Sequence, residues 1–324
     1  MATASAPGKV YLFGEHAVVY GEPAVPCAIE RRATVSVERR TDGRVRVDAP
    51  ILSFEGVSVE FGEGPPRVDV PTDLARQGVR YIDAAVDQAR GAADDPDAGY
   101  TVRVESDLPI GAGLGSSAAV SVATIDAAAR ESGTTLDPTD IADRAYQVER
   151  EVQAGEASRA DTFCSTMGGA VRVEGDDCRT LEAAPLPFVI GYDGGAGDTG
   201  ELVAGVRGLK EDYGFAADTI AAIGDLVRHG EHRLADGDIE ELGRLMDINH
   251  GLLSALGVSS RSLDAMVWAA REAGADGAKL TGAGGGGCIV ALDDSGATET
   301  ALDYAPDCEQ AFRAELATEG LIHE

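Results

Sequence analysis

Hydrophobic and polar residues alternate along much of the first hundred positions, and this alternation predicts strands. The stretches with strand character are residues 10–13, 33–38, 44–48, 57–61 and 100–104. Residues 73–90 differ, because their apolar side chains recur at helical spacing. The first third of the chain therefore predicts several strands and one long helix.

Helical and strand patterns then follow one another to the end of the chain. Helices are predicted over residues 116–130, from Asp137-Pro138 to about residue 153, and over most of 201–272. Strands are predicted over residues 168–173, 188–192, 278–280, 288–292 and 312–316. This order favours an α+β fold over a doubly wound parallel sheet. Pro185 and Pro187 mark a break, which predicts two domains, residues 1–184 and 185–324.

Charge narrows the classes of partner. The chain has 324 residues with 56 acidic and 27 basic side chains, a net charge of −29. Such a chain repels nucleic acid and anionic lipid, so we expect neither as a partner. The acidic residues are spread along the chain, and lysine occurs only at Lys9, Lys210 and Lys279. This composition favours a protein adapted to a salt-loaded cytoplasm over an ordinary acidic protein. No apolar stretch approaches the ~18 residues of a membrane span and no secretory signal is recognisable, so a cytoplasmic location is expected.

Several residues that often carry chemistry are predicted to be structural. The five cysteines are widely spaced without a C-x-x-C pair, which predicts buried thiols and neither a disulfide framework nor a zinc cluster. Trp268 shares an apolar helical stripe with Leu263 and Met266 and is expected in the core. His250 is expected to begin a turn and to be structural.

The first glycine-bearing segment with candidate chemistry is PGKVYLFGEHAVVYG, residues 7–21. It places Lys9, Glu15 and His16 around a short apolar strand. Because the chain otherwise uses arginine, a lysine here indicates a site that needs a compact ammonium with an adjustable pKa. The alternative is a surface lysine and a histidine buried in the core.

The second segment is DLPIGAGLGSSAA, residues 107–119. Its glycines let the backbone curl and approach a ligand closely. The Ser-Ser-Ala-Ala that follows opens a helix, whose N-terminal N–H groups suit a phosphate. The Ser117 hydroxyl is a candidate ligand of Mg²⁺. The alternative is an ordinary strand-to-helix connection with serine caps.

The third segment is KLTGAGGGGC, residues 279–288. Gly282, Gly284 and Gly287 match G-x-G-x-x-G, but a dinucleotide-binding fingerprint opens a helix early in a βαβ unit. This segment lies near the C-terminus and precedes a predicted strand, so we reject that interpretation. A Walker A motif is also absent from the sequence, because Gly8-Lys9 is followed by valine.

In their order and rough spacing, the three segments resemble the signature motifs of the GHMP family of small-molecule kinases, and the resemblance covers nearly the whole chain. It implies an N-terminal domain similar to domain 2 of ribosomal protein S5, a ferredoxin-like C-terminal domain and an active site in the cleft between them. It also implies ATP as phosphoryl donor. The residues that it assigns to the phosphate loop are Pro109, Gly111, Ala112, Gly113, Leu114, Gly115, Ser116, Ser117 and Ala118.

Within this family, KVYLFGEHAVVYG is similar to the mevalonate kinases, whereas galactokinases typically continue G-E-H into T-D-Y. The stretch EREVQAGEASRADT resembles their segment with a metal-binding glutamate and a catalytic aspartate. It implies Asp161 as the catalytic residue and Glu149 as the Mg²⁺ ligand if Ala154 is a one-residue insertion. Glu151 takes the place of Glu149 if the insertion lies elsewhere. Arg159 stands where glycine is usual in the family.

The resemblance implies transfer of the ATP γ-phosphoryl group to the primary hydroxyl of mevalonate, a step whose rate comes mostly from positioning and charge stabilisation. Lys9 is implied to keep the Asp161 carboxylate ionised and to lower the pKa of the hydroxyl. Asp161 either accepts the hydroxyl proton or anchors the hydroxyl electrostatically. Mg²⁺ is implied to be held by Ser117 and Glu149, and the mevalonate carboxylate to be met by Lys9 and by His16 if protonated. The implied substrate contacts are Lys9, Glu15, His16, Thr199, Gly282 and Ala283.

Two other functions remain open at this point. One is a GHMP kinase for a phosphomevalonate, a sugar or an amino-alcohol, and the other is a GHMP-fold protein that binds ligand without catalysis. The joint presence of Lys9, Ser117, Glu149 and Asp161 favours an enzyme over the silent protein. A homodimer is compatible with the sequence.

Overall fold

The computed structural model describes residues 1–49, 57–62, 64–68, 73–109, 111–153, 157–195 and 197–323. Strands and helices follow the α+β order expected from the sequence, so that prediction of fold class is confirmed. Among the helices in these ranges, none has the length and apolar character that a bilayer span requires.

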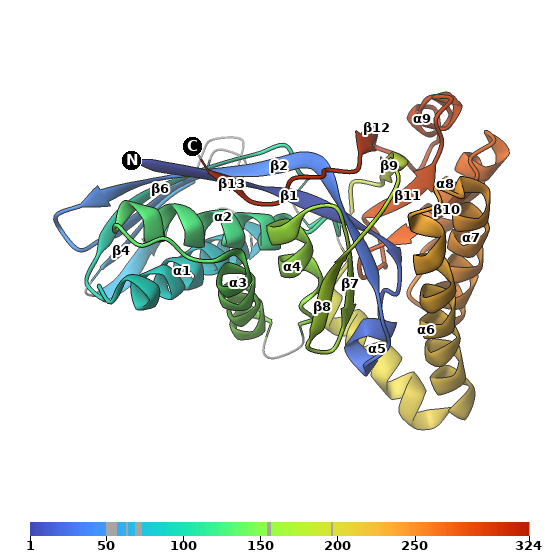
Figure 1. Ribbon diagram of the computed structural model, residues 1–324, viewed down its shortest axis with the longest axis horizontal. Coiled ribbons are helices and arrows are strands. Elements are labelled where there is room, and N and C mark those ends of the chain that lie inside the picture. The colour runs from blue at the N-terminus through green and yellow to red at the C-terminus, as the bar shows by residue number, and fades with distance from the viewer. Residues whose placement is uncertain are drawn as a thin grey trace.

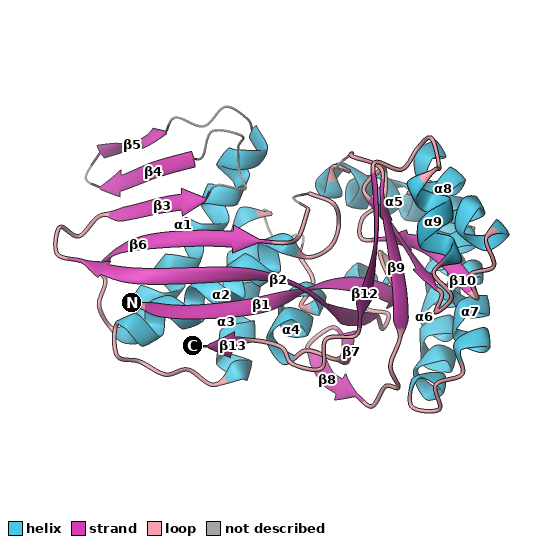
Figure 2. Cartoon of the chain, turned by 90° about the horizontal axis from the view of Figure 1, so that it is seen from above, coloured by secondary structure: helices cyan, strands magenta, loops and turns pink. Residues whose placement is uncertain are grey.

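Mostly antiparallel strands form the N-terminal sheet, in which β3 and β6 run parallel to each other (Figure 2). Its strand order is β13-β1-β2-β6-β3-β4-β5, and β7 pairs with β2 and β8. The bounds are β1 (Ala2–Phe13), β2 (Val25–Arg40), β3 (Val45–Ala49), β4 (Val57–Gly62), β5 (Gly64–Val68), β6 (Gly99–Ser106), β7 (Ala170–Glu174), β8 (Asp177–Leu181) and β13 (Ile322–His323). Because β13 pairs with β1, the C-terminus returns to the N-terminal sheet and both ends of the chain lie close together (Figure 1).

Four helical segments cover one face of this sheet in the described part of the chain (Figure 1). They are α1 (Asp73–Ala93), α2 (Ser116–Glu131), α3 (Pro138–Val152) and α4 (Ala160–Met167). Residues 118, 119 and 121–129 of α2 are buried, because this helix lies between the sheet and its neighbours α1 and α3. A helix buried on all sides must carry small apolar residues throughout, which accounts for the alanine-rich sequence of α2. The helix packs on the inner strands β1, β2 and β6 of the sheet.

The C-terminal sheet has the strand order β10-β11-β9-β12. Its strands are β9 (Pro187–Tyr192), β10 (Gly277–Thr281), β11 (Cys288–Leu292) and β12 (Gln310–Glu315). Its helices are α5 (Thr199–Asp212), α6 (Gly214–Leu234), α7 (Ile239–Ala255), α8 (Arg261–Glu272) and α9 (Ala297–Asp303). In chain order this is a strand, helices, two strands, a helix and a strand, with the first strand between the third and the fourth. That is the ferredoxin-like arrangement that the family resemblance implies.

Two expectations about single residues are wrong. Trp268 is 61% exposed, with its ring 5.5 Å from the Arg271 guanidinium, while Met266 and Val267 face the core. Each helical step turns a side chain by about 100°, so the residue after Val267 leaves the buried stripe of α8. His250 lies inside α7 and does not begin a turn; its Nδ1 accepts a hydrogen bond from the Leu280 N–H at 3.3 Å. Its expected structural role stands.

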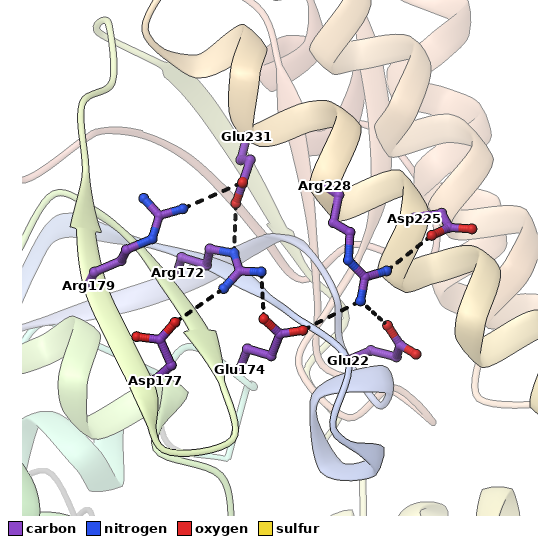
Figure 3. A network of polar contacts seen from close by, with 8 residues as sticks. All are labelled: Glu22, Arg172, Glu174, Asp177, Arg179, Asp225, Arg228 and Glu231. Carbon is purple, nitrogen blue, oxygen red and sulfur yellow. Dashed lines mark hydrogen bonds and ion pairs between the residues drawn. The ribbon is translucent and has the colours of Figure 1, made fainter.

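A network of ion pairs joins the N-terminal sheet to helix α6 (Figure 3). The Arg172 guanidinium of β7 lies 2.6 Å from Glu174 and 2.8 Å from Glu231 of α6. Arg228 of α6 lies 3.4 Å from Glu174 and 2.8 Å from Glu22, which follows the short 3-10 helix η1 (Ala17–Tyr20). Glu174 thus contacts both arginines, and the network runs without a break from β7 to α6.

The two arginines of this network are expected to contribute unequally to stability. The Arg172 side chain is 10% exposed, so Arg172→Met leaves Glu231 poorly solvated and is expected to lower the free energy of unfolding by about 1–2 kcal/mol. The Arg228 side chain is 44% exposed, so Arg228→Met is expected to cost at most about 0.5–1 kcal/mol, and less as salt rises. Urea unfolding at low and high KCl measures both changes. Equal costs for both variants at every salt concentration would contradict this assignment.

Candidate active site

The glycine loops of the two sheets touch at the cleft between them. A Cβ atom added to Gly282 would lie 2.9 Å from the Gly113 Cα, and one added to Gly113 would lie 3.0 Å from the Thr281 carbonyl oxygen. Both glycines also have positive φ, 87° and 81°, which other residues rarely adopt. The two loops therefore meet backbone to backbone, and this contact accounts for glycine in both motifs.

The cleft has a volume of about 1040 Å³. Most residues singled out from the sequence line it, namely Lys9, Glu15, His16, Gly111, Ala112, Gly113, Leu114, Gly115, Ser116, Ser117, Glu149, Asp161, Thr199, Gly282 and Ala283. Pro109 and Ala118 do not line the cleft, and Ala118 is buried. The first turn of α2 opens into the cleft, where its free N–H groups can receive an anion.

Lys9 and Asp161 form an ion pair in the cleft. The Lys9 ammonium lies 3.2 Å from Asp161 Oδ2 and donates a hydrogen bond of 2.9 Å to the Gly113 carbonyl. The Lys9 N–H donates to the Leu114 carbonyl at 2.9 Å, so main chain and side chain both hold the phosphate loop. Asp161 lies in the first turn of α4 and keeps 24% of its side chain exposed. Lys9 and Asp161 are 152 positions apart in the sequence, and they meet at the lining of the cleft.

Ser117 and Glu149 form a second polar pair. The Ser117 hydroxyl donates to Glu149 Oε1 at 3.1 Å, and the Gln153 amide donates to Glu149 Oε2 at 3.1 Å. Glu149 is buried, whereas Glu151 is exposed on the same helix α3, so Glu149 is the glutamate beside Ser117. Ala154, the position of the supposed insertion, lies outside the described residues.

The Ser117–Glu149 pair fits a hard divalent cation. Burial, and then the nearby negative charge of Asp161, raise the pKa of Glu149 to about 8, because the hydrogen bond from Ser117 and the charge of Lys9 only partly offset them. Oxygen donors of this kind are the ligands that Mg²⁺ prefers, with waters and phosphates in the remaining positions. Within the described ranges, no group of three or more His, Cys, Asp or Glu residues is arranged to hold a metal.

Glu149→Gln is expected to stabilise the metal-free protein by about 1–2 kcal/mol near pH 8. In the unfolded chain this carboxyl loses its proton near the ordinary pKa of 4.5, whereas the folded chain keeps it up to about pH 8. The unfolded state therefore binds fewer protons between these values, and the free energy of unfolding of the wild type falls as pH rises through them. Urea unfolding in EDTA measures the difference.

Glu151→Gln is the matched control for this prediction, because Glu151 is exposed on the same helix. It is expected to leave the free energy of unfolding within about 0.5 kcal/mol of the wild type at each pH. A stabilisation by Glu149→Gln that stays constant between about pH 5 and pH 8 would contradict the raised pKa.

A buried ion pair joins Glu15, which lines the cleft, to Lys279, which does not. Lys279 of β10 contacts Glu15 Oε1 and donates to the carbonyls of Leu280 at 2.6 Å and Tyr11 at 3.4 Å. Burial raises the pKa of Glu15 and lowers the pKa of Lys279, while their mutual attraction opposes both shifts. The pair joins the end of the first motif to the start of the third.

His16 serves the backbone of the third motif. Its Nε2 lies 2.8 Å from the Ala283 carbonyl oxygen, which is only an acceptor, so Nε2 carries the proton. Burial lowers the pKa of His16, so the ring is neutral near pH 7. A neutral His16 adds no positive charge, so of the two candidates for meeting the substrate carboxylate, Lys9 is the one that the geometry favours.

Of the two remaining residues that the sequence singled out, Thr199 lines the cleft and Arg159 does not. Arg159 precedes α4 with φ −71° and ψ −8°, a conformation open to any residue, so the family's glycine is not needed here. Its guanidinium pairs with Asp143 and lies 3.0 Å from Asp176, which ties the start of α4 to α3 and to the β7–β8 turn. Thr199 begins α5, is exposed and lines the cleft.

Sequence reasoning missed three residues that hold the site together. Tyr11 donates from its hydroxyl to Asp161 Oδ1 at 2.9 Å, Gln153 bonds to Glu149, and Lys279 pairs with Glu15. A signal existed for each residue. Tyr11 follows Lys9 by two positions on a strand, Gln153 follows Glu149 by four on a helix, and Lys279 is as rare a lysine as Lys9.

Comparison with known proteins agrees with this geometry. The model of the GHMP kinases N terminal domain matches residues 79–169, that of the GHMP kinases C terminal matches residues 226–307, and the galactokinase galactose-binding signature matches residues 2–39. The mevalonate kinases of Thermococcus sibiricus and Thermococcus onnurineus are 44% and 42% identical, each over 98% of this chain and 97% of the relative. The crystal structure of the Methanococcus jannaschii mevalonate kinase is similar with a TM-score of 0.80 and 26% identity, over 97% of this chain and 98% of that one. This chain therefore belongs to the GHMP kinase family, among its mevalonate kinases.

Proposed function

We propose that this ATP-dependent kinase transfers the γ-phosphoryl group of ATP to the primary hydroxyl of mevalonate in the cleft between its two sheets. The observation that carries the proposal is the 3.2 Å ion pair of Lys9 and Asp161 beside the phosphate loop. Relatives above 40% identity over nearly the whole chain are mevalonate kinases. The product would enter the synthesis of isoprenoid precursors.

ATP would bind with its phosphates against residues 111–118. The free N–H groups at the start of α2 and the curled glycine backbone supply donors, and the positive end of the helix dipole favours the negative charge. Contact of Gly282 with Gly113 holds this loop in shape from the C-terminal sheet.

Asp161 would receive the proton of the mevalonate hydroxyl or hold that hydroxyl in line with the γ-phosphorus. The Lys9 ammonium stabilises the carboxylate and the negative charge that grows on the attacking oxygen. Thr199 and the Gly282–Ala283 backbone line the cleft and would contact the rest of the substrate, with His16 fixing Ala283 and Glu15 fixed by Lys279. The positioning of the two reactants and the stabilisation of charge in the transition state would then account for most of the rate acceleration.

Mg²⁺ is the metal that we propose for Ser117 and Glu149. When bound with ATP, it neutralises part of the charge on the phosphates. EDTA is then expected to stop ADP release, and added Mg²⁺ to restore it.

The test of the proposed function is a substrate panel with coupled detection of ADP. Mevalonate is expected to give turnover well above phosphomevalonate, galactose and an amino-alcohol. Galactose is the alternative that a specific observation favours, since the galactose-binding signature matches residues 2–39. Turnover with galactose but not with mevalonate would contradict the proposal, and ATP binding without turnover on any alcohol would indicate a silent binding protein.

Further proposals concern the setting of the enzyme. The net charge of −29 supports a cytoplasm rich in salt, and activity that rises with KCl up to molar concentration would agree with it. The division into domains 1–184 and 185–324 and a homodimeric assembly also remain predictions. Limited proteolysis and a measurement of mass in solution test them.

A further inference from the structure

Tyr11 lies on the same face of β1 as Lys9, since alternate residues of a strand point the same way. Its side chain is buried, and its hydroxyl donates to Asp161 Oδ1 at 2.9 Å. The Lys9 ammonium lies 3.2 Å from the other oxygen, Asp161 Oδ2. Each oxygen of the carboxylate is therefore held by a different residue of one strand.

The phenol ring also contacts the cation. The Lys9 ammonium lies 4.3 Å from the centroid of the Tyr11 ring, within the range of a cation–π interaction. Tyr11 therefore contacts both members of the ion pair, the ammonium through its ring face and the carboxylate through its hydroxyl.

The hydroxyl acts as a donor in this arrangement. Burial, and then the charge of Asp161, raise the pKa of the Tyr11 phenol well above its usual value, so the phenol stays protonated. A neutral phenol that faces an ionised carboxylate can only donate, and such charge-assisted hydrogen bonds are stronger than neutral ones. Tyr11 is thus no candidate for the proton acceptor of the reaction.

The main chain of Tyr11 is anchored from the other sheet. Its N–H donates to the Thr281 Oγ1 at 2.8 Å, and its carbonyl accepts from the Lys279 ammonium at 3.4 Å. Because Thr281 and Lys279 belong to β10, this strand holds the main chain that carries the phenol. The Tyr11 hydroxyl therefore reaches Asp161 from a strand whose main chain is held on both sides.

We propose that Tyr11 is a positioning residue that orients the Asp161 carboxylate between its own hydroxyl and the Lys9 ammonium, so that the carboxylate faces the substrate hydroxyl. This inference rests on the proposed function of Asp161. Without the phenol hydroxyl, the Asp161 carboxylate is held at one oxygen and can rotate about its terminal bond. Small errors in the placement of a reacting group cost large factors in rate.

Tyr11→Phe tests the proposal, because it removes the hydroxyl and keeps the ring. We expect kcat with mevalonate to fall about 10- to 100-fold. The KM values for ATP and mevalonate are expected to stay within about twofold, since the lost interaction acts on the reacting group and not on substrate binding.

Tyr100→Phe is the matched control. Tyr100 is also fully buried, and its hydroxyl lies 2.5 Å from the Ser132 hydroxyl, away from the cleft. This variant loses a buried phenol hydrogen bond as well, so it reproduces a loss of stability. Its kcat is expected to stay within about twofold of the wild type.

A second readout separates positioning from a merely structural role. Against an Asp161→Asn background, adding Tyr11→Phe is expected to change the residual rate by less than about twofold, because the oriented carboxylate is already gone. Equal losses in both backgrounds, or a kcat of Tyr11→Phe that matches Tyr100→Phe, would overturn the proposal.

The proposed function fails separately from this inference. If the wild type turns over another alcohol and not mevalonate, the proposed substrate is wrong, and the same pair of variants compared on that alcohol decides the role of Tyr11. If the wild type turns over no alcohol, both proposals are overturned.

Discussion

Asp161→Asn is expected to lower kcat by about 10³-fold while ATP binds with nearly unchanged affinity. The amide is the same size as the carboxylate, so it can still fill the space between Tyr11 and Lys9. It cannot take up a proton, and it leaves the Lys9 ammonium without its opposite charge. The loss therefore falls on the chemical step, and phosphate binding by the loop and α2 is retained. Coupled ADP release and titration with a fluorescent ATP analogue measure the two quantities.

Asp126→Asn is the matched control for that variant. Asp126 is a buried aspartate that pairs with Arg130 at 2.8 Å, but it lies on α2 nine residues after Ser117. At 1.5 Å per residue this is more than ten ångströms along the helix, outside the reacting centre. Its kcat is expected to stay within about twofold of the wild type even if stability falls. Turnover of Asp161→Asn within tenfold of the wild type would remove Asp161 from its assigned role.

The resemblance to the GHMP kinase motifs implied that the three glycine segments meet at one cleft, and glycine suits the close backbone contact between the second and third segments. Gly113 and Gly282 adopt positive φ and meet each other's backbone, and neither requirement depends on distant side chains. Lys9 was recognisable for a similar reason, since a lysine is rare in a chain that otherwise uses arginine. Local chemistry of this kind is readable from sequence alone.

Contacts set by tertiary packing were not predictable in the same way. The sequence left Glu149 and Glu151 as alternatives, and burial separates them, because two helical steps turn their side chains to nearly opposite sides of α3. The eight-residue helix α4 was missed since its short sequence shows no clear stripe. Trp268 was predicted in the core because it follows apolar residues of α8. An apolar residue next to a buried stripe can lie just outside it, and the pattern alone does not show where the stripe ends.

The lysines show how far scarcity can be used as a signal. Lys9 and Lys279 are buried and pair with carboxylates, whereas Lys210 is exposed on α5. An ammonium is compact and carries three donors, so at these two buried positions we expect the larger planar guanidinium of arginine to be a poor substitute. The same argument that identified Lys9 thus applies to Lys279, whose partner Glu15 lies 264 positions away in the chain.

Lys279→Met is expected to lower the free energy of unfolding by about 3 kcal/mol at neutral pH. Methionine keeps much of the volume, but the carbonyls of Leu280 and Tyr11 lose a donor and the buried Glu15 carboxyl loses its cation. Glu15 must then take up a proton on folding, so its pKa in the folded variant lies above that in the unfolded chain. Above the pKa of Glu15 in the unfolded chain, the unfolded variant binds fewer protons than the folded variant. The free energy of unfolding of the variant therefore falls as pH rises, and the cost of the substitution grows. Urea unfolding of the wild type and the variant at several pH values above 4.5 measures both the cost at neutral pH and its growth with pH.

The double variant Glu15→Gln with Lys279→Met separates the lost charge pair from lost packing. If the unpaired carboxyl causes most of the cost, the double variant is expected to recover at least about 1 kcal/mol and to lose the pH dependence. Lys210→Met, a change of the same type at an exposed position, is expected to stay within about 0.5 kcal/mol of the wild type. A cost for Lys279→Met no larger than that for Lys210→Met would show that the pair does not hold the first and third motifs together. The first and third motifs would then be joined by the hydrogen bonds of Tyr11 to Thr281 and of His16 to Ala283, while the contact of Gly113 with Gly282 joins the second motif to the third.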